Sequence, residues 1–540
     1  MPTGLARASV IFAALVTVRA YADNYPRQPA IDALHYAFHV TLSDVTDEIS
    51  AQTTAEVRFQ SGGTRQLVLD LATPTQGKGM TVTSVECPGA TCRFEHARDR
   101  LTITLSEAPP AGESRQFTIT YHGVAADGLH IGSNRFGERT FFSWNWPVLA
   151  RQWLPVIDHP SDKASSEFIV TAPAQYQAVA NGALVEVRDL GGGLQLTHWK
   201  ESVPVAPWLN NIGVARFARS RFATVEGVPL ETWLFPSDRQ NGIATFEVPM
   251  RQAVEFFTSH IGPFPYERLA AVETAGLSGA MEHASAIFFG ESSVTPKPAF
   301  SLVAHEVSHQ WFGDSVTEKD WDDAWLSEGF ATYCAALAAE FYHGREEFLG
   351  VMRKARTEIL RMEKEPPVAS VVHDNLAEIR GGQAPMRLVY EKGAFTLHML
   401  RGLVGEEKFW AGLRQYYRRY RDSNASTNDF RTVMEQTSGR ELGWFFRQWL
   451  YRAGSPVVKG SWKYDAKARM VRLDLAQTQA GEPFRLPLEV ATRSNGKVQV
   501  HRIELTGASG SFDLRVTGAP ESVVLDANSW TLMDAVLERR

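Results

Sequence analysis

The chain has 540 residues, of which 44% are hydrophobic and 21% are charged, so it is long enough for about three or four globular domains. Its net charge of −6 gives no reason to expect nucleic acid or an anionic membrane as a partner.

The first 22 residues have the pattern of an export signal. Arg7 precedes an apolar run from Ala8 to Val18, and Ala20-Tyr21-Ala22 then forms a small-x-small cleavage pattern. The run is too short for a transmembrane helix, which needs roughly 20 apolar residues. We therefore predict a signal peptide over residues 1–22 and a periplasmic or secreted protein without a membrane segment after its removal. A retained membrane anchor is the competing interpretation.

Residues 23–225 predict an N-terminal β domain. Apolar and polar residues alternate in short runs such as YAFHVTL, and turn sequences such as SGGT and LGGG separate the runs. This period of two is typical of antiparallel strands. Cys87 and Cys92 flank a Pro-Gly turn, and in an exported protein we expect them to form a local disulfide, although two free thiols are also possible.

Residues 226–455 predict a mostly helical domain, because the apolar period changes from two to that of a helix. The spacing predicts helices over 241–259, 298–312, 324–342, 386–404, 406–421 and 427–451. Ser426 with Asp429 predicts an N-cap for the last of these, and Asp322 predicts one for the helix at 324. Cys334 lies in an apolar helical stretch, so we expect it to be buried.

Alternation returns over residues 456–540, after Gly454-Ser455-Pro456, and predicts a small C-terminal β-sandwich domain. The fold class expected for the whole chain is therefore multidomain α+β.

The stretch HEVSH, His305 to His309, places two histidines four residues apart. On a helix these side chains project from the same face, where both can bind one zinc ion, and Glu306 can lie beside a water on that ion without being a ligand. The short motif alone is only a hypothesis, because such matches arise by chance. Zinc needs a third ligand, and Glu328 in AWLSEGFATY, on the next predicted helix, is the candidate.

Several segments in the same order resemble the zinc-aminopeptidase family of aminopeptidase N and leukotriene hydrolase. HEVSHQWFGDSVT, then eighteen residues between His309 and Glu328, matches the family's spacing, whereas thermolysin-type endopeptidases place the glutamate one residue further along. GAMEH, VANG, VYEKGA and RQWLYRAGSPVV resemble further family segments. The resemblance covers about residues 30–535 and implies a thermolysin-like catalytic domain, with one Zn²⁺ per chain and peptides as substrates.

The resemblance also implies roles for individual residues. His305, His309 and Glu328 would hold the zinc, Glu306 would be the general base, and Tyr390 would donate to the negative oxygen that develops on the scissile carbonyl. The substrate-binding residues implied by GAMEH are Gly279, Ala280, Met281 and Glu282, with the Glu282 carboxylate pairing with a free α-ammonium group.

The chain departs from the family pattern at two places. His283 stands where the family has asparagine, and we expect it to be a hydrogen-bonding residue that packs the loop. Many relatives continue into a large helical domain that covers the cleft; we expect this chain to lack that domain and to have a more open cleft. The sequence leaves open the side-chain preference at the substrate's N-terminus and the oligomeric state.

Three further functions are compatible with the sequence: a zinc endopeptidase, an epoxide hydrolase that uses the same ion, and a non-catalytic peptide-binding protein of the same fold. Proteins of the last kind typically lose a ligand or the base, and this chain retains all of these residues.

Overall fold

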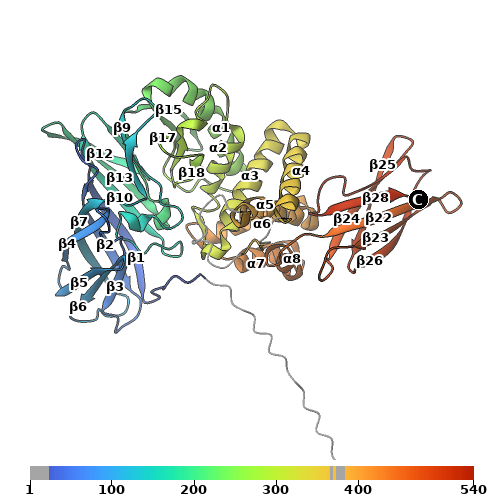
Figure 1. Ribbon diagram of the computed structural model, residues 1–540, viewed down its shortest axis with the longest axis horizontal. Helices are drawn as coiled ribbons and strands as arrows, with labels where there is room; N and C mark the ends of the chain where they lie inside the picture. Colours follow the sequence, from blue (N-terminus) through green and yellow to red (C-terminus); the bar gives the residue numbers. More distant parts are fainter. Residues whose placement is uncertain (1–22, 365–368, 373–383) are drawn as a thin grey trace, which may run out of the picture.

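The computed structural model describes residues 23–364, 369–372 and 384–540. The predicted signal peptide lies outside these residues. The molecule is elongated, and its three parts follow one another along the longest axis: a β-rich N-terminal part, a helical middle and a C-terminal β part (Figure 1). The predicted multidomain α+β fold is confirmed.

The N-terminal part is built on one large sheet and two smaller ones. In the large sheet β1 pairs in parallel with β10, and the other pairs are antiparallel. Its strand order is β12 (Ala183–Gly191), β13 (Leu194–Val205), β10 (Ala164–Pro173), β1 (Ile31–Thr41), β2 (Ile49–Phe59), β7 (Ser114–Val124) and β4 (Gly79–Glu86). The smaller sheets are β11 (Gln177–Ala180), β14 (Ile212–Ala215), β9 (Arg139–Ser143) and β8 (Leu129–Ser133), and β3 (Gln66–Asp70), β6 (Arg100–Leu105) and β5 (Cys92–Ala97).

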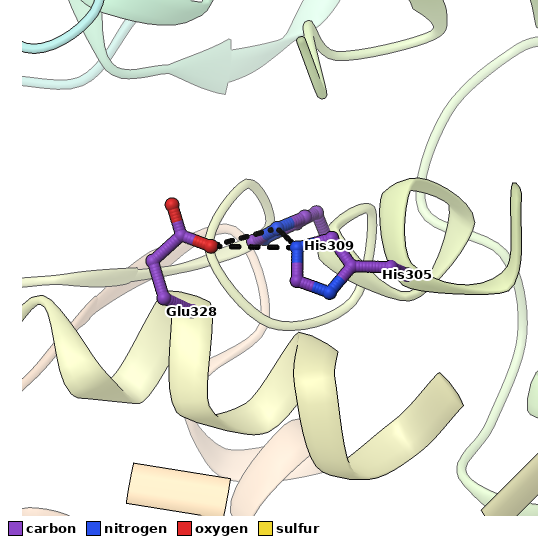
Figure 2. Close-up of side chains that lie close together, drawn as sticks. All are labelled: His305, His309 and Glu328. Atoms are coloured by element: carbon purple, nitrogen blue, oxygen red, sulfur yellow. Dashed lines mark hydrogen bonds and ion pairs between the residues drawn. The ribbon is translucent and has the colours of Figure 1, made fainter. Parts of the chain in front are cut away.

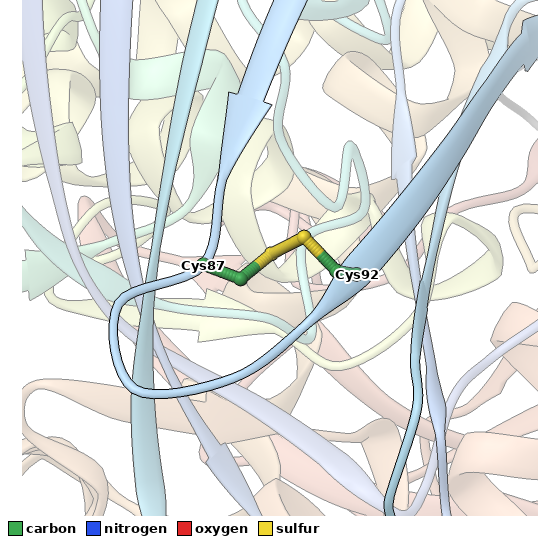
Figure 3. Close-up of a disulfide and its surroundings, with 2 residues drawn as sticks. All are labelled: Cys87 and Cys92. Carbon is green, nitrogen blue, oxygen red and sulfur yellow. A yellow bond between two sulfur atoms is a disulfide. The ribbon is translucent and has the colours of Figure 1, made fainter.

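A disulfide joins Cys87, which directly follows β4, to Cys92, which begins β5 (Figure 3). The predicted pairing is therefore confirmed. Cys334 is buried, also as expected.

A five-stranded sheet connects the N-terminal part to the helices. Its order is β15 (Ala218–Val225), β16 (Val228–Leu234), β17 (Leu269–Thr274), β19 (Ala286–Gly290) and β18 (Ala280–Met281). β15 precedes the boundary that the sequence predicts at residue 225, yet it pairs with β16. Strand β17 is buried on both faces: Leu269 and Ala271 belong to the apolar core of the helical part, and Ala270 and Val272 to that of the N-terminal part. This explains why its sequence is apolar without alternation.

The described helices are α1 (Arg239–His260), α2 (Phe300–His309), α3 (Trp325–His343), α4 (Arg345–Met362), α5 (Ala384–Val404), α6 (Glu406–Tyr420), α7 (Thr427–Ser438) and α8 (Gly443–Leu450). The prediction of one helix over 427–451 was wrong: Gly439 has φ 71° and ends α7. Helix α4 was missed, although its buried face repeats every three to four residues through Phe348, Met352, Ala355 and Ile359.

The two predicted helix caps have different outcomes. Ser426 and Asp429 form a reciprocal capping box at α7. The predicted cap at Asp322 was wrong, because it is Asp320 whose side chain accepts a hydrogen bond, from the Asp322 amide, at a short 3-10 turn before α3. The first residues of α3 have no side-chain cap and are packed in the core instead.

The C-terminal part contains two sheets whose buried residues share one apolar core with the helices. Their orders are β26 (Ser509–Arg515), β23 (Met470–Gln477), β22 (Val457–Asp465) and β28 (Asp534–Arg539), and β25 (Lys497–Leu505), β24 (Leu486–Ser494) and β27 (Ser522–Leu525). In the part of the chain that the structure describes, no helix has both the length and the apolar character needed to cross a membrane.

Candidate metal centre

Two histidines of α2 meet at their ring nitrogens. They lie one helical turn apart, and the Nε2 atoms of His305 and His309 are 3.1 Å from each other. The side chain of His309 is 1% exposed, and that of His305 is 18% exposed and borders a pocket. The pair is therefore reached from the pocket through His305, while His309 is buried.

Glu328 completes a triangle of ligand atoms from the first turn of α3. Its Oε2 atom lies 3.4 Å from the Nε2 atom of each histidine (Figure 2). The three side chains point toward one another and their ligand atoms all lie within 4.8 Å. The structure thus brings together the three predicted ligands from two consecutive helices.

The ring nitrogen of His309 that faces away from the candidate ligand atoms, Nδ1, contacts Ser327, the residue before Glu328. Nδ1 of His309 lies 3.0 Å from Oγ of Ser327, directly before Glu328. Gly313 permits this contact, because it has φ 122° and a Cβ there would clash with Ser327 Oγ. A partner at Nδ1 fixes the ring so that Nε2 faces the centre of the triangle.

The electrostatics of the site fit a bound cation. Burial alone would lower the pKa of His309, but the carboxylates of Glu282, Glu328 and Glu306 raise that pKa well above its usual value. Burial alone would raise the pKa of Glu328, but hydrogen bonds with His305 and His309 lower it to about 2. The surroundings therefore favour positive charge between these groups, and two imidazole nitrogens with one carboxylate oxygen are a ligand set typical of zinc.

Glu306 lies beside the triangle on α2 and is buried. One of its carboxylate oxygens lies within 4.8 Å of ligand atoms of Glu282 and His309. Burial raises the pKa of Glu306 to about 8. A carboxyl group of this kind can hold or release a proton near neutral pH.

Tyr390 of α5 contacts the third ligand. Its hydroxyl donates a hydrogen bond of 2.5 Å to Oε1 of Glu328, and its ring is parallel to that of His305 with centroids 6.1 Å apart. Burial, followed by the charge of Glu328, raises the pKa of Tyr390 well above its usual value. The phenol is therefore neutral and can act as a hydrogen-bond donor.

The predicted substrate-binding segment forms an edge of the five-stranded sheet. Gly279 has φ 90°, and Ala280 and Met281 form β18, which in the described part of the chain pairs with β19 alone. The next residue, Glu282, is 5% exposed, and burial raises its pKa to about 7. An open strand edge therefore leads to a carboxyl group that lies close to the candidate ligands.

His283 differs from its predicted role. Both ring nitrogens are buried without a hydrogen-bond partner among the described residues, and the ring packs edge-on against Phe288 with centroids 4.8 Å apart. Burial lowers the pKa of His283 to about 3, so the ring is neutral. The expectation that this side chain hydrogen-bonds was wrong; its contribution is packing.

A pocket of about 430 Å³ adjoins the candidate ligands. Its wall includes Trp146 from the N-terminal part, together with His305, Thr332, Met386, Arg387, Tyr390 and Glu391. Sequence reasoning identified neither Trp146 nor Ser327. Ser327 could have been suspected, because it is the immediate neighbour of a ligand, whereas nothing local in the sequence places Trp146 at the site.

Two family models match this chain. The Peptidase M1 N-terminal domain matches residues 32–209, and the Peptidase family M1 domain matches residues 247–449. The second range contains the candidate ligands, Glu306, Tyr390 and the segment 279–282.

Among curated proteins, the Tricorn protease-interacting factor F2 of Thermoplasma acidophilum is 27% identical over 87% of this chain and 60% of its own length. Probable aminopeptidase 2 of Sulfurisphaera tokodaii is 29% identical over 66% of this chain and 45% of its own length. The chain thus spans only about half the length of these relatives. Among solved structures, an M1 zinc metallopeptidase from Deinococcus radiodurans matches with a TM-score of 0.67 and 26% identity, over 78% of this chain and 93% of that one.

Proposed function

Because this chain belongs to the M1 peptidase family, we propose that it is a zinc-dependent aminopeptidase, which hydrolyses the first peptide bond of peptides that have a free α-amine. The observation that carries this proposal is the convergence of two carboxyl groups, Glu306 and Glu282, on His309 within 4.8 Å, beside the triangle of candidate ligands.

His305, His309 and Glu328 would hold one zinc ion, which when bound would polarise the scissile carbonyl and make a water molecule acidic enough to attack it at neutral pH. Glu306 accepts the proton of that water and later passes it to the leaving amine. Burial raises the pKa of Glu306 to about 8, and a cation held by the three ligands would lower it, so that the carboxylate is ionised and can accept. The neutral phenol of Tyr390, at the ligand Glu328, is the second donor for the oxygen on which charge develops.

Glu282 restricts the reaction to the chain end. Its carboxylate pairs with the α-ammonium group of the substrate, so that only the first peptide bond reaches the ligands. A charge-assisted contact of this kind contributes about 1.5–3 kcal/mol, or roughly a 10- to 100-fold preference for a free amine. The open edge of β18 provides the backbone groups with which an extended peptide can pair as an added strand.

We further propose that the protein acts outside the cytoplasm after residues 1–22 are removed. The disulfide between Cys87 and Cys92 supports this, because such bonds persist in oxidising compartments.

The test compares two peptides of the same sequence, one with a free and one with an acetylated N-terminus, incubated with the full chain with and without a metal chelator. We expect release of the first residue from the free peptide, with kcat/KM roughly 10- to 100-fold above that for the acetylated peptide. We also expect loss of activity on chelation and recovery with Zn²⁺.

Glu306→Gln is the matched control, because it keeps the size of the side chain and all three ligands; it should bind zinc without hydrolysing either peptide. Internal cleavage of both peptides at equal rates would instead indicate an endopeptidase. Hydrolysis of an epoxide in place of a peptide would indicate an epoxide hydrolase, and peptide binding without any turnover would indicate a non-catalytic binding protein. Full activity of Glu306→Gln would overturn the assignment of the base.

A further inference from the structure

The loop that carries Glu282 is held by two amide side chains, one from the residue that directly follows the metal-ligand helix α2 and one from the N-terminal β part. We propose that Gln310 and Asn181 are positioning residues that clamp this loop, and that the clamp sets the preference for a free amine. The inference rests on the proposed function, since it concerns how Glu282 is placed.

Gln310 holds the loop from the side of the ligands. It directly follows His309, and its Nε2 atom donates to the carbonyl oxygen of Glu282 at 3.0 Å and to Asp314 Oδ2 at 2.8 Å. Its Oε1 atom accepts a hydrogen bond of 2.8 Å from the amide of Ser285. Gln310 is fully buried, so these contacts do not compete with solvent. One side chain thereby bridges both ends of the loop.

Asn181 holds the loop from the N-terminal β part. Its Nδ2 atom donates to the carbonyl oxygen of Ala284 at 2.8 Å, and the amide of Gly182 donates to Oγ of Ser285 at 2.6 Å. Gly182 has φ 77°, and a Cβ there would clash with the carbonyl oxygen of Lys200.

Arg268, from the middle part of the chain, hydrogen-bonds to the backbone on either side of Asn181. Its buried guanidinium group donates to the carbonyl oxygens of Ala180 and Gly182, at 2.5 and 2.7 Å. Asn181 therefore has a fixed backbone on both sides.

The loop needs these external contacts because, of its own described side chains, that of His283 adds no hydrogen bond and that of Ser285 bonds to the neighbouring part of the chain, at the Gly182 amide. His283 has no hydrogen-bond partner in the described part of the chain, and Ser285 lies in the left-handed region with φ 63°. The backbone of residues 282–285 is held mainly by groups that belong to other elements.

The clamp links the amine anchor to the metal ligands. Gln310 is one residue from His309, so any shift of the loop relative to α2 changes the distance between Glu282 and the ligands. A charge-assisted contact depends steeply on its geometry, whereas attack on a bound carbonyl depends on the ligands and Glu306. Loosening the clamp should therefore weaken recognition of the free amine more than it weakens hydrolysis itself.

The experiment measures kcat/KM for the free and the acetylated peptide with Gln310→Met and Asn181→Ala, together with zinc content and hydrogen–deuterium exchange of residues 281–286. We expect KM for the free peptide to rise, so that the preference ratio falls at least about fivefold, within the 10- to 100-fold range that the contact supplies. The acetylated peptide should be hydrolysed at the wild-type rate, zinc content should be unchanged and exchange of the loop should be faster.

Asn424→Ala is the control, since Asn424 is also an interdomain amide that donates to two carbonyl oxygens, those of Pro160 and Glu318, but does not touch the loop. This variant should leave unchanged both the ratio of kcat/KM for the free and the acetylated peptide and the hydrogen–deuterium exchange of residues 281–286. Should one clamp variant fail to fold, the other still decides, because the two residues belong to different parts of the chain and bond to different atoms of the loop.

An equal loss of activity on both peptides, or no change in loop exchange in either variant, would refute the clamp. A wild-type protein without preference for the free amine would refute the proposed function instead, and the exchange measurement would still decide whether the clamp exists.

Discussion

Asp162 has an unusual environment at the scale of single residues. Its Oδ2 atom is buried and has no hydrogen-bond partner in the described ranges, and Oδ1 accepts only a long hydrogen bond, of 3.4 Å, from the amide of Ala33. Burial therefore raises the pKa of Asp162 to about 8. At neutral pH this carboxyl group is mostly protonated in the folded protein, while it is ionised in the unfolded chain.

We predict that Asp162→Asn changes the pH dependence of stability. The folded protein keeps a proton that the unfolded chain releases above a pH of about 4, so the contribution of Asp162 to wild-type stability declines as the pH rises from about 4 to about 8 and is then level. The amide has no such proton. The variant should melt near the wild type at pH 4.5 and progressively above it toward pH 8, by roughly 1 °C per kcal/mol gained for a chain of this length, measured by calorimetry. Parallel melting curves at all pH values would contradict the raised pKa.

The candidate metal ligands and the residues that hold their surroundings differ in how far the sequence predicts them. His305 and His309 were predictable because the helical period fixes their common face, and Glu328 because its spacing resembles that of a known family. Gln310, Ser327 and Asn181 were not, because the partners that give them a place at the site are backbone or ring atoms brought close by tertiary structure. His283 was misread for the same reason: a histidine in a loop does not reveal whether a partner exists.

At the scale of elements, two glycines set the distance between α3 and α5. A Cβ at Gly329 would lie 2.9 Å from the backbone of Gly393, and a Cβ at Gly393 would lie 3.1 Å from Cα of Gly329. Gly329 directly follows Glu328, and Gly393 comes three residues after Tyr390. The close approach of the helices thus permits the hydrogen bond of 2.5 Å between Tyr390 and Glu328.

We predict that Gly329→Ala separates the helices and moves Tyr390 away from the site. Overpacking of this kind costs about 1–3 kcal/mol of stability, and we expect kcat to fall at least about tenfold with zinc still bound. Gly350→Ala in α4 is the control: a Cβ there meets nothing within 4 Å, so this variant should be as active and slightly more stable, as seen by thermal unfolding. Unchanged kcat in Gly329→Ala would show that the spacing is not needed.

The elements themselves were predicted well where the period is regular and less well where a single residue decides. The break between α7 and α8 depends on the left-handed conformation of Gly439, which a glycine permits but does not require. Helix α3 begins without a side-chain cap, and its first turn is held by core packing. A search for cap motifs in the sequence does not detect this kind of helix start.

At the scale of the whole molecule, an ion between His305, His309 and Glu328 would connect α2 to α3, two central helices of the core that the middle and C-terminal parts share. A ligand that binds only the folded state stabilises it by about 2.7–4.1 kcal/mol at 100 to 1,000 times its Kd. We therefore predict a higher melting temperature with Zn²⁺ than with a chelator, measured by calorimetry. His309→Ala is the control and should melt at the same temperature in both; the same shift in that variant would place the ion elsewhere.

The order of a β part, a helical part and a second β part was readable from two changes of apolar period. The joint between the first two parts was not, because β17 is buried on both faces and serves both cores. A strand of this kind has no alternation from which a boundary could be placed.

The contacts of Asn181 and Gly182 with the loop at 284–285 have a consequence for how such enzymes can diverge. If the N-terminal β part supplies half of the support for the amine anchor, recombination that exchanges this part between relatives would also exchange substrate choice, even with every ligand unchanged. Selection on what the enzyme cleaves would then act on residues that never meet the substrate.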